Sequence, residues 1–254
     1  MARSLWTGSL SFGLVNVPVQ LYSAVRDLDL HFRQLHAKDD TPIETHRVCS
    51  QEGKEVPYDE IGHEYEGVVL TDSELSAADP AKTRTIDIEA FVKLEEIDPV
   101  YFDHPYYLAP AGETDGTVRA YRLLAGVMDK TERAALGRFV LRSKEYLVAI
   151  RVRDKALTLS TLRFADEVRS PKELPGAGGR TKPKEVKEAV KLIEALSTDW
   201  DPSNYEDEYR KRLQAIVRKK RQGGEIKQPE TDPERTQAVP DLMAALEASL
   251  QKVG

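Results

Sequence analysis

The sequence predicts a mixed α+β protein, with an antiparallel β-barrel core that is followed by C-terminal helices. Short alternating apolar runs, separated by charged turns, fill most of residues 5–169. A break rich in Gly and Pro follows at 171–183, and beyond it two stretches carry apolar residues at helical spacing. Short strands joined by local turns favour a small antiparallel barrel over a sheet built from β-α-β units.

The first strand segment, residues 5–24, changes the phase of its apolar side chains partway along. Even positions come first and odd positions follow: Leu10, Phe12 and Leu14, then Val15, Val17, Val19 and Leu21. Strand side chains repeat every two residues, so this change moves the apolar set to the opposite face. A bulge or bend near Gly13 to Asn16 restores one buried face, and Gly13 and Pro18 suit a curved or edge strand.

The middle of the chain supplies further strands and two helices. Residues 67–70 read as a strand, and Thr71 with Glu74 forms a capping box for a short helix that ends near Asp79-Pro80. Apolar residues at helical spacing predict a helix over 117–128. Three strand-like runs follow at 138–142, 146–152 and 156–162.

Two amphipathic helices are expected after the Gly/Pro break. Their apolar stripes are Val186, Val190, Ile193 and Leu196, then Tyr209, Leu213, Ile216 and Val217. The second ends in Arg218-Lys219-Lys220-Arg221 before Gly223, which complements the negative end of the helix dipole and provides a stop. Residues 225–239 are polar and contain two prolines, which predicts a flexible linker, and Asp241 caps a last short helix.

Composition excludes several classes of protein. At 254 residues and 40% hydrophobic, the chain can bury one good core or one core with a small appendage. No apolar run approaches the ~18 residues that span a membrane, and Met1 leads directly into strand pattern without a secretory signal. The lone Cys49 cannot form an internal disulfide, which fits a reducing cytoplasm. A net charge of −6 argues against indiscriminate coating of nucleic acid, because phosphate contacts need cations.

No pattern of catalytic or metal-binding residues is present. The glycine cluster before Arg180 lacks the Gly-Lys-Ser/Thr ending of a phosphate-binding loop, so it is interpreted as a linker. His31 and His36 lie five residues apart, a spacing unsuited to a shared metal on a helix, and Cys49 has no second thiol. We therefore expect no metal, no cofactor and no enzymatic activity.

Seven segments in order resemble one family. They are residues 5–24, His36-Ala37-Lys38-Asp39, Arg47-Val48-Cys49, Thr83-Arg84-Thr85-Ile86, residues 101–108, residues 162–169 and Asp201-Pro202-Ser203-Asn204-Tyr205. This set resembles the bacterial Ku proteins, the end-binding factors of DNA double-strand-break joining, and the resemblance runs from Met1 to Lys252. It implies a ring-shaped homodimer in which two barrels form a cradle and paired arms close over duplex DNA.

The resemblance also implies a division of the chain. The core is expected at 1–180 with a dimerising arm at about 38–65, a helical arm at 181–223, a linker at 224–239 and a ligase-docking helix at 240–254. The arm region is poorly periodic and too long for an ordinary loop. Such a ring binds double-stranded ends of any sequence, so phosphate contacts and shape matter rather than base edges. The candidate phosphate contacts are Arg3, Lys38, Arg47, Lys54, Arg84, Arg142 and Lys144.

The C-terminal segment is the second candidate site. Leu242, Leu246 and Leu250 recur every four residues, and Met243 adjoins their stripe. Pattern alone leaves two alternatives open, docking onto the chain's own barrel or binding in a partner's groove. The resemblance implies the second, with the ATP-dependent end-joining DNA ligase as partner. An alternative for the whole protein is an interaction scaffold that has lost most DNA binding, which the acidic balance and Glu44 suggest. A protein of the expected function works in the cytoplasm, at the nucleoid.

Overall fold

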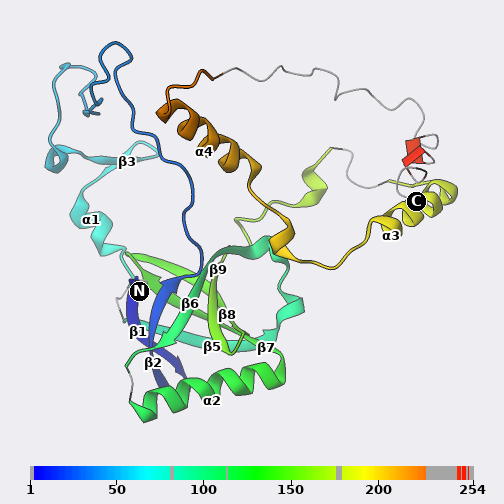
Figure 1. Cartoon of the computed structure of the whole chain (residues 1–254). Helices are drawn as coiled ribbons and strands as arrows, with labels where there is room; N and C mark the ends of the chain where they lie inside the picture. Colours follow the sequence, from blue (N-terminus) through cyan, green and yellow to red (C-terminus); the bar gives the residue numbers. More distant parts are fainter. Residues whose placement is uncertain are drawn as a thin grey trace. The chain divides into compact units, whose positions relative to one another are not determined.

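The computed structural model describes residues 3–80, 83–112, 114–175 and 179–226, together with 245, 246, 248, 249 and 251. The chain divides into two compact units. The first comprises residues 1–28 and 32–169, and the second comprises 29–31 and 170–254. Each unit is described by itself below (Figure 1).

The first unit contains a closed barrel of seven strands, which confirms the predicted barrel core (Figure 1). Around the barrel the strands are β1 (Trp6–Phe12), β2 (Val15–Ser23), β6 (Phe102–Pro110), β9 (Ala156–Leu162), β8 (Lys144–Arg153), β7 (Arg133–Leu141) and β5 (Thr85–Lys93). Neighbouring strands are antiparallel except where β5 returns to β1, and that parallel pair closes the barrel. Closure leaves no unpaired sheet edge.

The phase change of the first segment arises from a hairpin, so the prediction of a bulge or bend within one strand was wrong. Phe12 pairs with Val15, which leaves Gly13 and Leu14 as a two-residue turn. Gly13 has φ +57°, as the first central residue of a type II′ turn requires. Such a turn pairs even-numbered residues with odd-numbered ones, so Leu10 faces Val17 and both are fully buried. The pattern therefore predicted most of the buried set, but Leu14 at the tip and Val15 beside it are exposed.

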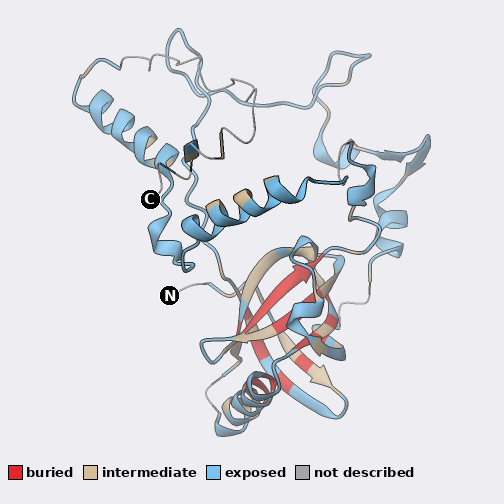
Figure 2. Ribbon diagram, turned by 90° about the vertical axis from the view of Figure 1, so that its right-hand side faces the viewer, coloured by how far each residue is buried: buried red, intermediate tan, exposed pale blue. Residues whose placement is uncertain are grey.

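The helix α2 (Asp115–Thr131) closes one end of the barrel and includes the predicted 117–128 (Figure 2). Its side chains Tyr121, Leu124, Ala125 and Met128 join the strand residues in one buried cluster. The Tyr121 hydroxyl donates to the Leu108 carbonyl at 2.7 Å and accepts from the Leu157 amide at 2.8 Å. Burial raises the pKa of this phenol. A single hydroxyl therefore satisfies two backbone groups on β6 and β9.

Two tight turns join β7 to β8 and β8 to β9. Arg142 and Ser143 form the first, Asp154 and Lys155 the second, and all four residues have positive φ, as in type I′ turns. The sequence prediction began the first of these strands at Arg138, but β7 already begins at Arg133. Arg142 belongs to the turn and not to a strand.

We call residues 24–84, between β2 and β5, the arm; this segment extends beyond the predicted 38–65 on both sides. It carries a 3-10 turn at Tyr58–Glu60, the two-stranded ribbon of β3 (His63–Tyr65) and β4 (Val68–Leu70), and helix α1 (Asp72–Ala77). The Thr71–Glu74 capping box is confirmed, with both of its reciprocal hydrogen bonds present. No described residue between Leu21 and Ile86 is buried (Figure 2). The arm thus lacks a core of its own.

Two short 3-10 turns, Leu94–Glu96 and Pro99–Tyr101, connect β5 to β6. In the second unit, the turn Pro171–Glu173, helix α3 (Pro183–Leu196), the turn Pro202–Asn204 and helix α4 (Glu208–Arg221) follow one another. Both helices confirm the predicted ones, and α4 ends before Gly223, which has φ +76°. Neither contains a buried residue.

Most of the predicted last helix, including Asp241, Leu242, Met243 and Leu250, lies outside the described residues. Ala245, Leu246, Ala248, Ser249 and Gln251 adopt helical backbone. The Ser249 hydroxyl donates to the Ala245 carbonyl at 2.8 Å. Over the described part of the chain, every helix is too short or too polar to cross a membrane.

Replacing Tyr121 by Phe is expected to destabilise the barrel by about 1–3 kcal/mol, because a buried amide and a buried carbonyl lose their partner. Urea unfolding of the Tyr121→Phe variant measures the change. The control is Tyr107→Phe, whose ring lies on the barrel surface with 37% exposure. Equal unfolding free energies for the two variants contradict the assigned role.

Candidate nucleic-acid interface

Topology brings four of the predicted phosphate contacts to one end of the barrel. Strands β1, β5, β6 and β8 start at this end, and β2, β7 and β9 finish there. Arg84 therefore enters β5 beside the Arg142 turn and Lys144, the first residue of β8, while Arg3 precedes β1. Helix α2 packs at the opposite end, against the end of β6 and the start of β9. We call the end with the four cations the open end.

Arg84 is fixed by backbone contacts with β1. Its carbonyl accepts a hydrogen bond from the Ser9 amide at 3.0 Å, and its φ of +50° is left-handed. The same carbonyl passes so close to Gly8 that a Cβ there would lie 2.2 Å from it. Only glycine permits this approach. The backbone of Arg84 is thus rigidly placed, while its side chain is exposed.

Arg142 and Lys144 flank a group of aromatic residues at the open end. The Lys144 ammonium lies 5.2 Å from the centre of the Tyr146 ring, a cation–π contact. Burial raises the pKa of Tyr106. The nearby Tyr146 and Asp103 raise it further, and the charge of Arg142 lowers it. The guanidinium of Arg142 is therefore close enough to influence this phenol. Both cations remain exposed and available to a phosphate.

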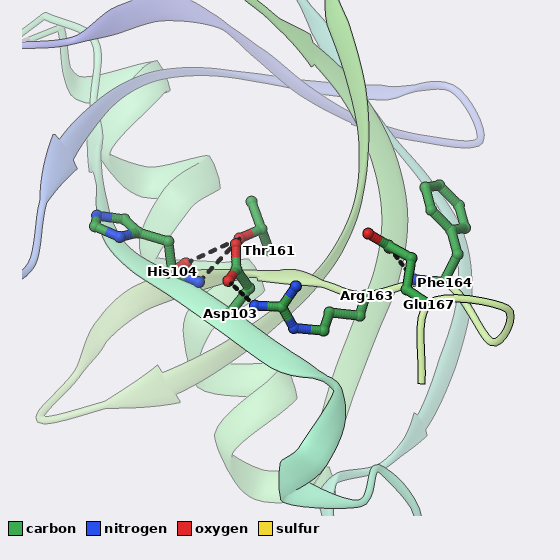
Figure 3. Close-up of polar contacts among 6 residues, drawn as sticks. All are labelled: Asp103, His104, Thr161, Arg163, Phe164 and Glu167. Carbon is green, nitrogen blue, oxygen red and sulfur yellow. Dashed lines mark hydrogen bonds and ion pairs between the residues drawn. The ribbon is translucent and has the colours of Figure 1, made fainter. Parts of the chain in front are cut away.

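A bulge at the start of β6 shapes the same end of the barrel (Figure 3). The buried Thr161 hydroxyl accepts from the His104 amide at 3.0 Å and lies 3.4 Å from an Asp103 carboxylate oxygen. Arg163 donates to the other oxygen of Asp103 at 2.7 Å. Nearby, the Glu167 carboxylate accepts from the Phe164 amide at 2.7 Å. Because its charge is paired with Asp103, Arg163 is a weaker candidate for DNA contact.

The other three predicted contacts lie along the arm. Lys38 lies in a turn that His36 and Asp39 close with a side-chain contact of 2.9 Å. Lys54 closes a second turn, where its carbonyl accepts from the Cys49 amide at 2.8 Å. The Arg47 guanidinium lies 5.4 Å from the centre of the Tyr58 ring. All three are exposed, and none forms an ion pair with a carboxylate of the described residues.

The arm also carries acidic groups beside these cations. His46 contacts Glu55 at 2.8 Å and Glu44 at 3.6 Å. The hydrogen bond and charge of the Glu55 carboxylate raise the pKa of His46, and Glu44 adds a smaller effect. Carboxylates outnumber Lys and Arg along the arm as a whole. Any grip of the arm on DNA therefore depends on where its few cations point.

Sequence reasoning gave no binding role to the basic end of α4. Arg218, Lys219, Lys220 and Arg221 are all exposed there, and none has a carboxylate partner in the described ranges. The run of four cations is visible in the sequence, but it was interpreted only as a feature that complements the negative end of the helix dipole. By contrast, Arg138 is exposed yet paired with both Glu89 at 3.1 Å and Glu145 at 3.2 Å.

Among the residues that the structure describes, no group of three or more His, Cys, Asp or Glu side chains is placed to hold a metal ion. Cys49 is a free thiol. Backbone hydrogen bonds from Glu52 and then Gln51 lower its pKa.

Comparison with known proteins decides the family. A family model described as the Ku70/Ku80 beta-barrel domain matches residues 11–192. The chain belongs to the Ku family. The non-homologous end joining protein Ku of Opitutus terrae is 40% identical to it, over 99% of this chain and 92% of its own length. The protein of the same name from Anaeromyxobacter sp. is 42% identical over 98% of this chain and 86% of its own.

A further relative is the non-homologous end joining protein Ku of Mycobacterium tuberculosis, 36% identical over 98% of this chain and 95% of its own length. The family resemblance inferred from the sequence is thereby confirmed. Among solved structures, the SPOC domain of human PHD-finger protein 3 aligns with a TM-score of 0.32 and 10% identity over 63% of this chain. That likeness is too low to carry an argument.

The His46 cluster predicts a measurable pH dependence. Because the folded pKa of His46 is raised, any stabilisation from its pairing with Glu55 is complete below the unfolded pKa and disappears as pH rises through the folded one. In an NMR titration, His46 is expected to titrate above the usual value of about 6.5. Glu55→Gln should lower that midpoint, whereas Glu52→Gln should leave it unchanged. A midpoint insensitive to Glu55→Gln contradicts the pairing.

Proposed function

We propose that this protein is a non-catalytic DNA-end-binding factor of bacterial non-homologous end joining, acting at the nucleoid. Two copies form a ring that threads onto linear duplex ends without reading their sequence. The observation that carries the proposal is the near-complete match to several proteins named non-homologous end joining protein Ku, over 98–99% of this chain. The exposed cations of the open end and the arm are consistent with it.

The structure of the arm supports a homodimer. Its apolar side chains are exposed in one chain, among them Phe32 at 65%, Tyr65 at 70% and Val69 at 72%. An isolated two-stranded ribbon such as β3–β4 is marginally stable in water unless something packs on it. Exposed apolar surface of this kind marks an interaction site. When a second copy of the arm packs against the first by two-fold symmetry, one interface covers the exposed apolar side chains of both copies.

Enclosure gives selectivity for DNA ends. A ring that contacts phosphates and fits the width of the duplex accepts any sequence, because phosphate contacts carry no sequence information. A closed ring loads only from a terminus, so an intact circle is not a substrate. A concave basic lining can oppose the negative net charge of the whole chain, because a concave surface focuses the local field. The seven predicted residues, Arg3, Lys38, Arg47, Lys54, Arg84, Arg142 and Lys144, are proposed to line this channel.

The C-terminal segment 240–254 is proposed to recruit the ATP-dependent end-joining ligase. The stripe of Leu242, Met243, Leu246 and Leu250 suits helix-in-groove binding. Burial of each side chain contributes roughly 1.5–3 kcal/mol before ordering costs of a few kcal/mol, which is compatible with micromolar affinity.

A second candidate function is an interaction scaffold that no longer holds DNA. One observation favours it: carboxylates outnumber cations along the arm, and Glu44 and Glu55 lie on either side of His46. Gel shifts with linear and closed circular DNA separate the two. The ring binds the linear form and fails on the closed one, whereas the scaffold binds neither.

Salt dependence tests the open end directly. If the dimer makes about six phosphate contacts, the logarithm of the association constant falls against log salt with a slope near −5. The triple variant Arg84→Ala, Arg142→Ala, Lys144→Ala should move this slope towards zero and weaken binding at every salt concentration. Arg138→Ala is the matched control, because that arginine is already paired with Glu89 and Glu145. If the triple variant keeps the parental slope, the open end does not line the DNA channel.

Leu246→Asp should abolish ligase stimulation and leave DNA-end binding intact, because it places a charge in the apolar stripe. Ala248→Asp adds the same charge away from the stripe and should retain stimulation. Ligation of linear DNA and a parallel gel shift measure the two activities. Loss of both activities in Leu246→Asp would refute a separate docking segment.

A further inference from the structure

An apolar groove runs along one flank of α2, at the closed end of the barrel. The groove has a volume of about 600 Å³. It is lined by Phe12 and Val15 of the β1–β2 hairpin, Phe91 of β5, and Leu123 and Val127 of α2, with Arg133 among them.

The groove is open to solvent and strongly apolar. Leu123 is 67% exposed and Val127 51%, and Leu14, at the adjoining hairpin tip, is fully exposed. Soluble monomers rarely leave a contiguous apolar surface of this kind without an interaction partner. Arg133 brings a charge to the groove, and no carboxylate of the described residues pairs with it. The site therefore fits a ligand with an apolar stripe and an acidic group beside it.

The sequence contains a segment with this chemistry. The chain continues past Ile226 to residues 240–254, where Leu242, Met243, Leu246 and Leu250 form a stripe at helical spacing. Glu247 follows Leu246 directly and flanks that stripe on a helix. The Ser249 hydroxyl donates to the Ala245 carbonyl, four residues earlier, at 2.8 Å, as in a helix. Stripe and groove match in polarity, and Glu247 complements Arg133 in charge.

We propose that the α2 groove of one copy receives residues 240–254 of a second copy. The exchange of identical segments between copies adds contact area without a new partner. Within a dimer the linker holds the segment at a high effective concentration. The consequence for joining rests on the proposed function: the docked segment is withheld from the ligase, so the ligase must displace it.

Disulfide trapping between copies tests the proposal in the full-length protein, without DNA or ligase. In a Cys49→Ser background, one copy carries Val127→Cys and a differently tagged copy carries Ser249→Cys. Mild oxidation should link the two tags. The control replaces Val127→Cys by Asp129→Cys, on the other flank of α2. Trapping there should be about tenfold slower or more, the ratio that corresponds to about 1.4 kcal/mol of preference.

A charge exchange sharpens the test. Arg133→Glu should slow trapping about two- to fivefold, the scale of an exposed ion pair, and adding Glu247→Arg should restore it. Equal rates for the Val127 and Asp129 positions, or trapping only when both cysteines lie in one chain, overturn the proposal. DNA-end binding by the same proteins is read separately, so a failure of this docking is distinguishable from a failure of the proposed function.

Discussion

The structure depends on the closure of the barrel by the parallel pairing of β1 with β5. This pairing is short and requires an unusually close approach between Gly8 and the Arg84 carbonyl. It also determines the course of the arm. The chain leaves the open end after β2 and must return to that same end to enter β5. Both ends of the arm are therefore anchored where four of the candidate phosphate contacts gather.

The two ends of the barrel differ in packing and in charge. Helix α2 closes one end, where the Tyr121 hydroxyl satisfies backbone groups on β6 and β9 that water cannot reach. The open end is held by the β6 bulge and its Thr161 contacts, and it carries exposed cations. A rigid scaffold with charged side chains on its rim suits binding to a regular polyanion, because the charges are already in place.

The arm follows a different physical logic. It has turns, a capping box and a short ribbon, but none of its described residues is buried. Local hydrogen bonds define its course, while large apolar side chains such as Phe32, Tyr65 and Val69 remain exposed. In the proposed homodimer, association supplies the packing that folding of one chain leaves out.

Much of the fold could be predicted from local pattern. The alternating segments, the Thr71–Glu74 capping box and the stripe of α2 each reflect a periodicity that neighbouring residues specify alone. The buried positions of β1 and β2 also followed from alternation, although the reason for the phase change was misread. A two-residue turn and a bulge produce the same change of parity, and only the pairing of Phe12 with Val15 distinguishes them.

The candidate site shows the same division. The sequence by itself determined which residues carry charge, which carry apolar stripes, and which family they resemble. Tertiary structure decided that Arg84, Arg142 and Lys144 lie at one end of the barrel. It also decided that Arg138 and Arg163 form ion pairs with carboxylates. These facts depend on strand order and register, which bring together residues far apart in the chain. Local periodicity contains no information about such long-range pairing.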